Sequence, residues 1–98
     1  MIKGNIMAYS AKFFETRKDT EFEIETLSDF GKLKLIDVTT LVPSTKGIEA
    51  FSIVFESQNP EILEQGTYTL VSSDFKDQIF IVPIGQDQDG TRYEAVFN

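Results

Sequence analysis

The fold is decided by residues 78–97, which read QIFIVPIGQDQDGTRYEAVF. The centre of this stretch contains Asp89-Gly90, a strong short-range signal for a tight β-hairpin turn. After the turn, residues 92–97 alternate side chains in a way that predicts a strand with one buried face. Before it, residues 78–84 are apolar on both faces, which is typical of a strand that is covered on both sides. Because Pro83 has no backbone N–H, we expect this strand to reach a sheet edge or a bulge at that point.

Four further strands are predicted upstream of the hairpin. In the first of them Phe22 and Ile24 alternate with acidic residues and share the inward face. In the second, the inward-facing set of side chains changes near Leu35-Ile36, which indicates a bulge or a bend. The four strands cover residues 21–27, 32–41, 50–56 and 67–71, and they are separated by a turn at 28–31, a loop at 42–47 and a short helical turn at 61–65.

The predicted strands are joined by short connections. A parallel sheet would need a crossover helix between successive strands, whereas antiparallel strands need only turns. The sequence therefore predicts a mainly β fold in which residues 21–98 form a small antiparallel six-stranded barrel or sandwich. With 98 residues, the chain has the usual length of a single domain, so we expect one core over residues 1–98.

The first twenty residues are expected to form a short N-terminal helix and a turn. Asn5 is a candidate N-cap, and a turn is expected at residues 18–20. Near-helical spacing places two apolar stripes side by side, formed by Ile6, Tyr9 and Phe13 and by Met7, Ala11 and Phe14.

The composition excludes several classes of function. The chain contains neither Cys nor His, so it cannot form a disulfide, a thiolate metal site or a Ser-His-Asp or Cys-His catalytic arrangement. Glu21, Glu23 and Glu25 share one strand face and so do not oppose one another across a cleft, as the two carboxylates of a glycosidase must. We therefore expect no catalytic residue, no cofactor and no enzymatic activity.

Residues 87–94 contain a fragment of a calcium-loop pattern, Asp87-Gln88-Asp89-Gly90, followed by Glu94. An EF-hand needs a third oxygen ligand, Gly at its sixth position, a bidentate Glu at its twelfth and a helix afterwards. Here a strand is predicted to follow, so a hairpin turn is the better interpretation and no metal ligand is expected.

The net charge and the hydropathy of the chain limit the kinds of partner that it is expected to bind. Sixteen acidic residues against nine basic ones give a net charge of −7, and no basic cluster exceeds Arg17-Lys18. Such a surface repels a phosphate backbone, so nucleic-acid binding is not expected. The chain contains no signal-peptide apolar region and no apolar run of roughly 20 residues that would span a membrane. We expect a cytoplasmic protein that does not bind membranes.

The aromatic side chains admit two interpretations. They form a packed core, which is usual for a barrel this small, or they line a cavity for a small apolar ligand. The residues concerned are Phe13, Phe14, Phe22, Phe51, Phe55, Tyr68, Phe80, Tyr93 and Phe97.

The second half of the chain resembles a family of short bacterial domains of unknown function. The resemblance is carried by Phe51-Ser52-Ile53-Val54-Phe55, Gln65-Gly66-Thr67-Tyr68-Thr69-Leu70, Phe80-Ile81-Val82-Pro83-Ile84-Gly85 and Tyr93-Glu94-Ala95-Val96-Phe97-Asn98. It covers residues 50–98, with a weaker match at Phe14 and Phe22, and the family pattern has Gly at the position of Asp19. The resemblance implies no known activity or cofactor, and it links some members to genes for phage tail-collar or tail-fibre-like proteins.

The motif residues are expected to have structural roles in the first instance. Gly66 is expected to provide a positive φ or a close approach where a loop enters the fourth strand, and Gln65 is expected to satisfy backbone groups of that loop. Tyr93, Glu94 and Asn98 are expected to join the last strand to its neighbour through polar contacts. The full set of motif residues is Gln65, Gly66, Tyr68, Pro83, Gly85, Tyr93, Glu94, Phe97 and Asn98.

Two hypotheses of function follow. The first is a non-enzymatic protein-interaction or structural module, part of a phage-tail-like or other multiprotein assembly, which binds a protein partner or self-associates. It would dock through a sheet edge or through the end that carries the helix. The alternative is a β-barrel that binds a small apolar ligand.

Overall fold

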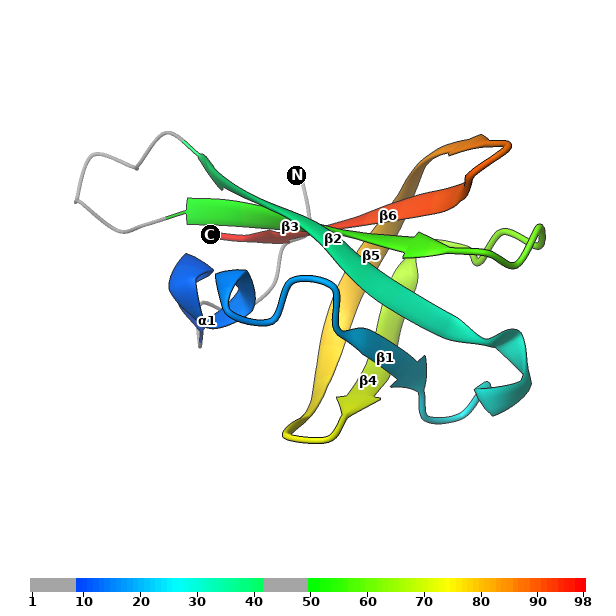
Figure 1. The fold of residues 1–98 in the computed structure, drawn as a ribbon, viewed down its shortest axis with the longest axis horizontal. Helices are drawn as coiled ribbons and strands as arrows, with labels where there is room; N and C mark the ends of the chain where they lie inside the picture. The colour runs from blue at the N-terminus through cyan, green and yellow to red at the C-terminus, as the bar shows by residue number, and fades with distance from the viewer. Residues whose placement is uncertain (1–8, 42–49) are drawn as a thin grey trace.

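The computed structural model describes residues 9–41 and 50–98, and these residues form one antiparallel sheet of six strands (Figure 1). The strand order is β1-β2-β3-β6-β5-β4, and pairing of β1 with β4 closes the sheet into a ring. The predicted mainly β fold is thus confirmed, and ring closure favours a barrel over a sandwich. In chain order the elements are α1 (Ala11–Glu15), β1 (Glu21–Ile24), the 3-10 turn η1 (Ser28–Phe30), β2 (Lys32–Leu41), β3 (Ala50–Ser57), β4 (Gly66–Ser72), β5 (Phe75–Asp87) and β6 (Gly90–Phe97).

The hairpin predicted at residues 85–90 joins β5 to β6. The register of this pair shifts between Pro83 and Gly85, so the predicted irregularity at the proline is a bulge. Gly90 has a φ of 137°, and a Cβ added there would overlap the backbone carbonyl oxygen of Ser57 on β3. The turn therefore needs Gly for its conformation and for the close approach of β3.

The change of inward side chains predicted near Leu35-Ile36 is also a bulge. The register of β2 against β3 shifts between Leu35 and Asp37. On the other side of β2 the backbone of Leu35 is paired with the turn that precedes β1, because its N–H donates to the Thr20 carbonyl over 3.0 Å and its carbonyl accepts from the Asp19 N–H over 2.7 Å. The bulge thereby anchors the segment that connects α1 to the sheet.

The inside of the ring is filled by apolar side chains. Phe22 and Ile24 are completely buried, as their alternation predicts. Each such burial stabilises the fold by about 1.5–3 kcal/mol before the cost of ordering the chain is counted. The same inward face includes Leu33, Leu35, Phe51, Ile53, Phe55, Leu70, Ile79, Ile81, Tyr93, Ala95 and Phe97.

The N-terminal helix starts later than predicted. Ser10 has an extended backbone, and its hydroxyl accepts a hydrogen bond from the Phe13 N–H over 3.2 Å, so Ser10 is the N-cap of α1. The expected cap at Asn5 and the stripe positions Ile6 and Met7 lie outside the described residues. Phe14 is buried and packs against Phe51 and Phe97, with ring centroids 6.0 and 5.3 Å apart.

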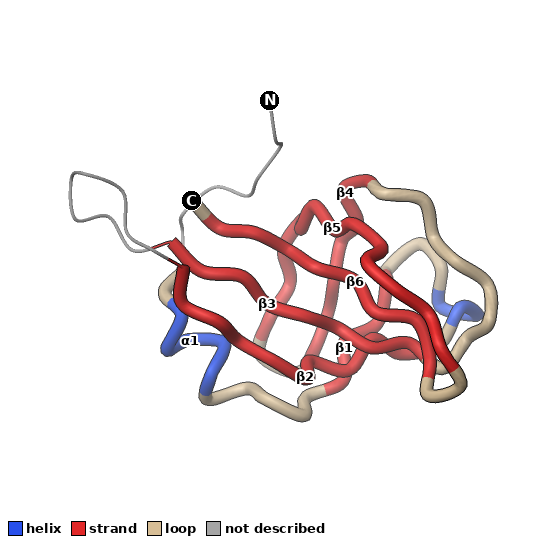
Figure 2. The backbone as a smooth tube through the Cα atoms, turned by 90° about the horizontal axis from the view of Figure 1, so that it is seen from above, coloured by secondary structure: helices blue, strands red, loops and turns tan. Residues whose placement is uncertain are grey.

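Several predicted elements differ from those of the structure. β1 ends at Ile24 and not at residue 27, the expected helical turn at 61–65 is irregular chain, and β5 begins at Phe75 and not at Gln78. The predicted loop at 42–47 lies outside the described residues. Figure 2 shows that α1 lies at one end of the ring and η1 at the other, where the β3–β4 loop, residues 58–65, also runs.

Candidate functional site

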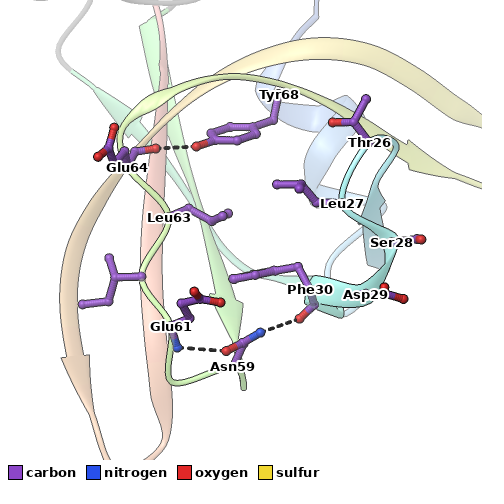
Figure 3. Close-up of a pocket in the computed structure, with 11 residues that line it drawn as sticks. Thr26, Leu27, Ser28, Asp29, Phe30, Asn59, Glu61, Leu63, Glu64 and Tyr68 are labelled. Atoms are coloured by element: carbon purple, nitrogen blue, oxygen red, sulfur yellow. Dashed lines mark hydrogen bonds between the residues drawn. The ribbon is translucent and has the colours of Figure 1, made fainter.

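A surface pocket of about 640 Å³ lies at the end of the ring that is distant from α1. One wall is the β1–β2 connection around η1, and the other is the β3–β4 loop (Figure 3). The two walls come from segments far apart in the sequence. Pairing of β2 with β3 brings η1 beside the start of the loop, and pairing of β1 with β4 brings the end of β1 beside β4, where the loop ends. The lining residues are Thr26, Leu27, Ser28, Asp29, Phe30, Asn59, Glu61, Ile62, Leu63, Glu64 and Tyr68.

Asn59 joins the two walls of the pocket. Its side-chain amide donates to the carbonyl oxygen of Phe30 over 2.9 Å, and its side-chain oxygen accepts from the Glu61 N–H over 2.8 Å (Figure 3). Its own N–H donates to the Ser57 hydroxyl over 3.1 Å. Asn59 therefore fixes the start of the loop relative to η1, although the loop has no regular secondary structure.

Two tyrosines hold the second half of the loop. The Leu63 N–H donates to the hydroxyl oxygen of Tyr93 over 2.9 Å, and the Tyr68 hydroxyl donates to the Glu64 carbonyl over 2.7 Å. Tyr93 is completely buried beneath the loop, and this burial raises the pKa of its hydroxyl. Its aromatic ring belongs to the core and its hydroxyl bonds to the loop that forms one pocket wall, so Tyr93 connects the packed core to the shape of the pocket.

The β5–β6 hairpin supports the loop from the other side. The Gln58 side chain donates to the Asp89 carbonyl and the Gln86 side chain donates to the Pro60 carbonyl, both over 2.9 Å. Gln86 also donates to the buried Thr91 hydroxyl over 2.9 Å. Hydrogen bonds on three sides keep the loop in one conformation, so the pocket is formed before any ligand arrives.

Two exposed aliphatic side chains lie at the pocket. Leu27 is 40% exposed and Ile62 is 50% exposed, and both line this one pocket. Figure 3 shows Leu27, Phe30 and Leu63 facing one another across it. Ile84, which is 52% exposed, lies outside this lining. Clustered exposed aliphatic side chains mark a candidate interaction site more strongly than isolated ones.

The charges at the pocket are all negative. Its lining contains Asp29, Glu61 and Glu64 and includes neither Lys nor Arg. In Figure 3 the Glu61 carboxylate points into the pocket toward Phe30, whereas the Glu64 carboxylate points away and Asp29 lies at the outer margin. The pocket therefore combines exposed apolar side chains with polar ones, among them one inward carboxylate.

The structure brings together only some of the predicted motif residues. Tyr68 and Tyr93 both hold the β3–β4 loop, and Gln65 ends that loop with an exposed side chain. The interpretation of Gly66 is wrong, because its φ lies outside the left-handed region and an added Cβ would lie 3.7 Å from the Tyr68 ring, an ordinary contact. Pro83 is paired with Tyr93 at the β5 bulge.

The other motif residues lie away from the pocket. Gly85 follows the bulge, and a Cβ added there would meet no atom within 4 Å. Phe97 stacks on Phe51 with ring centroids 4.7 Å apart, at the end of the ring that carries α1. Glu94 and Asn98 make no side-chain hydrogen bond to another described residue, and Tyr93 bonds to the loop and not to a neighbouring strand. The polar side-chain contacts of β6 with its neighbours are made by Arg92, with Glu56 and Asp87, and by Thr91, with Gln86.

Sequence reasoning missed the residues that form the pocket walls. Leu27 is predicted as the last residue of a strand, and Asn59 falls in the connection between the predicted strands 50–56 and 67–71, with no functional role. The available signal was an Asx-type turn residue directly after a strand, since Asn side chains commonly bond to backbone two residues on. That signal indicates a fixed loop and does not indicate which second loop faces it.

Residues 9–41 and 50–98 contain no cluster of three carboxylates that could hold a metal ion. Asp87, in the calcium-like turn, accepts hydrogen bonds from the Arg92 guanidinium over 2.6 Å and from the Asp89 N–H over 2.8 Å. These hydrogen bonds, with that from Arg92 the strongest, hold the pKa of Asp87 below its ordinary value. Within the same ranges, no helix has the length and apolar character needed to cross a bilayer.

Comparison with known proteins identifies a family but no characterised relative. No curated protein and no solved structure matches the chain. A family model described as a domain of unknown function (DUF6916) matches residues 9–97, a range that includes α1, all six strands and both pocket walls. The chain therefore belongs to this family of domains of unknown function, DUF6916.

Proposed function

We propose that this domain is a non-enzymatic protein-interaction module that binds its partner through the pocket between η1 and the β3–β4 loop. The observation that carries the proposal is the position of Leu27 and Ile62, which are 40% and 50% exposed and line the same preformed pocket. Exposed apolar side chains that no described segment covers, on a rigid support, are the usual centre of a protein-binding surface.

The pocket also changes where docking is expected. A docking site at a free sheet edge has little support, because each of the six strands is paired on both sides along part of its length. The end that carries α1 turns Ala11 and Phe14 inward, where both are buried. The opposite end offers accessible apolar surface and is the better candidate.

The alternative, a small apolar ligand inside the ring, has less support. Phe22, Phe55 and Tyr93 are buried together within the ring, where such a ligand would have to lie. A small molecule would instead have to use the same surface pocket. The proposed biological setting is the cytoplasm of a bacterium and a multiprotein assembly, and phage-tail-like particles are the setting that the family resemblance favours.

A capture experiment with matched variants tests the proposal. The purified domain, immobilised, is expected to retain a defined protein from a lysate of its native host, and the Leu27→Ser, Ile62→Ser double variant is expected to lose that protein. Ile84→Ser is the control, because Ile84 is 52% exposed but is not part of the pocket lining. Loss of the partner in both variants, or in neither, would contradict docking at the pocket.

A second outcome separates the two functions. If the wild-type domain retains no protein, remains monomeric in solution and co-purifies with a small molecule that the double variant does not hold, then the pocket is a ligand site. The interaction hypothesis would then be abandoned.

A further inference from the structure

We infer that the pocket recognises an arginine side chain, presented beside an aliphatic residue by an extended segment of the partner protein. This inference rests on the proposed interaction function and adds the chemistry of the partner. Three features of the pocket support it: the charge, the aromatic wall and the exposed aliphatic side chains.

The charge of the pocket selects a cation. Glu61 points inward, Asp29 lies at the margin, and the lining contributes no basic residue that would neutralise them (Figure 3). The protein as a whole carries a net charge of −7, so its field also favours approach of a positively charged segment.

The aromatic wall favours arginine over lysine. Phe30 and Tyr68 contribute ring surface to a pocket that also contains the Glu61 carboxylate. A planar guanidinium can stack on a ring and donate two hydrogen bonds to a carboxylate at the same time, which a lysine ammonium cannot do.

The chain itself shows this arrangement at another place. The guanidinium of Arg17 lies 3.7 Å from the ring centroid of Phe13, and it donates to the Asp74 carboxylate over 2.7 Å. The pocket has the ring and the carboxylate of such a site but no cation within its lining. An arginine from a partner would complete it.

The exposed aliphatic side chains of the pocket indicate which type of residue lies next to the arginine in the partner segment. Leu27 and Ile62 leave apolar surface on the same pocket, and this surface is favourably covered by an aliphatic side chain. A pocket of about 640 Å³ accommodates two side chains of a peptide and not a whole secondary-structure element.

The test is selection from a random-peptide display library with the folded domain as bait. The expected result is enrichment of peptides that carry Arg next to an aliphatic residue. A representative synthetic peptide should bind about tenfold more weakly when its Arg is replaced by citrulline, which has the same shape but no charge, because one charge-assisted hydrogen-bonded contact is lost.

Two glutamates of the loop provide matched variants. Glu61→Gln should reduce peptide affinity by about tenfold, whereas Glu64→Gln, which removes the same charge from a carboxylate that points away, should change it less than about twofold. Both variants are expected to melt as the wild type does, because both side chains are exposed.

Every other result overturns the inference. Selection of no peptide, selection without preference for Arg, or equal effects of Glu61→Gln and Glu64→Gln would each show that the pocket does not recognise arginine. If the host partner is still lost in the Leu27→Ser, Ile62→Ser variant, the interaction function stands and only the partner chemistry is wrong. If that capture also fails, the interaction function fails with it.

Discussion

Asp19 shows how a single backbone conformation connects the helical end of the chain to the sheet. Its φ of 71° lies in the left-handed region, and its N–H donates to the Leu35 carbonyl at the bulge of β2. Residues other than Gly, Asn and Asp adopt this backbone conformation at a cost of roughly 1–2 kcal/mol. A Gly at this position would adopt the left-handed conformation without that cost.

Substitutions at Asp19 are expected to follow this preference. Asp19→Gly should change the free energy of unfolding by less than about 1 kcal/mol, because both residues tolerate this conformation, whereas Asp19→Val should lower it by about 1–2 kcal/mol. Asp19→Asn separates conformation from charge, because Asn keeps the tolerance of the left-handed region but not the carboxylate. Urea unfolding measures all three variants, and a stabilised Asp19→Val would contradict the argument.

Tyr9 is a second residue whose environment gives a measurable prediction. Burial against neighbouring side chains, followed by a hydrogen bond to Asp77 over 2.6 Å, raises the pKa of the Tyr9 hydroxyl from 10.0 to about 12. The unfolded chain therefore loses this proton at a lower pH than the folded chain. The stabilisation is complete below pH 10 and is lost as the pH rises toward about 12.

The urea midpoint of the wild type should consequently fall across this alkaline range. Tyr9→Phe should be less stable near neutral pH, because the hydrogen bond to Asp77 is absent, but its midpoint should fall less steeply above pH 10. Some alkaline dependence should remain, since burial also raises the pKa of Tyr93. If the urea midpoints of the wild type and of Tyr9→Phe fell in parallel as the pH rises, the pKa of Tyr9 would be the same in the folded and unfolded states, and the prediction would be wrong.

At the scale of elements, the β3–β4 loop has no regular secondary structure and is held by hydrogen bonds to tyrosine side chains. Tyr93→Phe removes the acceptor of the Leu63 N–H and should lower the free energy of unfolding by about 1–2 kcal/mol. The matched variant Tyr68→Phe removes only the donor to the Glu64 carbonyl, an exposed contact that water can replace, so its effect should be smaller.

Hydrogen exchange identifies where the loosening occurs. In Tyr93→Phe the Leu63 amide should exchange much faster, beyond any change in the amide of Ile53 in the core strand β3. Equal acceleration at both amides would indicate that Tyr93 stabilises only the ring and does not hold the loop.

The elements differ in how far the sequence predicts them. The bounds of β2 and the inward positions of Phe22, Ile24 and Tyr93 follow from alternation, because a strand with one buried face has a period of two. The start of α1 does not follow from the sequence pattern, because Asn5 and Ser10 are both acceptable N-cap residues. The helix that Ser10 caps is the one whose Phe14 packs into the core.

The pocket is the least predictable part. Its walls are two turns that become neighbours through two strand pairings: β2 with β3 brings Asn59 beside η1, and β1 with β4 brings the segment that contains Leu27 beside Tyr68. The pairing of non-consecutive strands is a long-range choice that alternation does not encode. The motif residues Tyr68 and Tyr93 both bond to the loop between β3 and β4, a contact that the pattern of the strands that contain them does not predict.

At the scale of the whole molecule, the acidic surface raises the question of divalent cations. The best oxygen ligands of the turn are engaged, because both carboxylate oxygens of Asp87 accept hydrogen bonds from within the chain. We expect addition of calcium or of a chelator to leave the melting temperature unchanged. A rise of several degrees in sub-millimolar calcium that is lost in Asp89→Ala would show that the turn binds metal after all.

Closure of the ring has a consequence for the order in which the molecule assembles. β1 and β4 meet in register only at Glu23 with Val71 and at Ile24 with Leu70, whereas β2 and β3 are in register along nearly the whole of β2. Joining β1 to β4 also closes a long stretch of chain, which is slow because its entropic cost precedes the gain from pairing. The hairpins β2–β3, β4–β5 and β5–β6 need no such closure. Folding is therefore expected to end, and unfolding to begin, with the same two residue pairs.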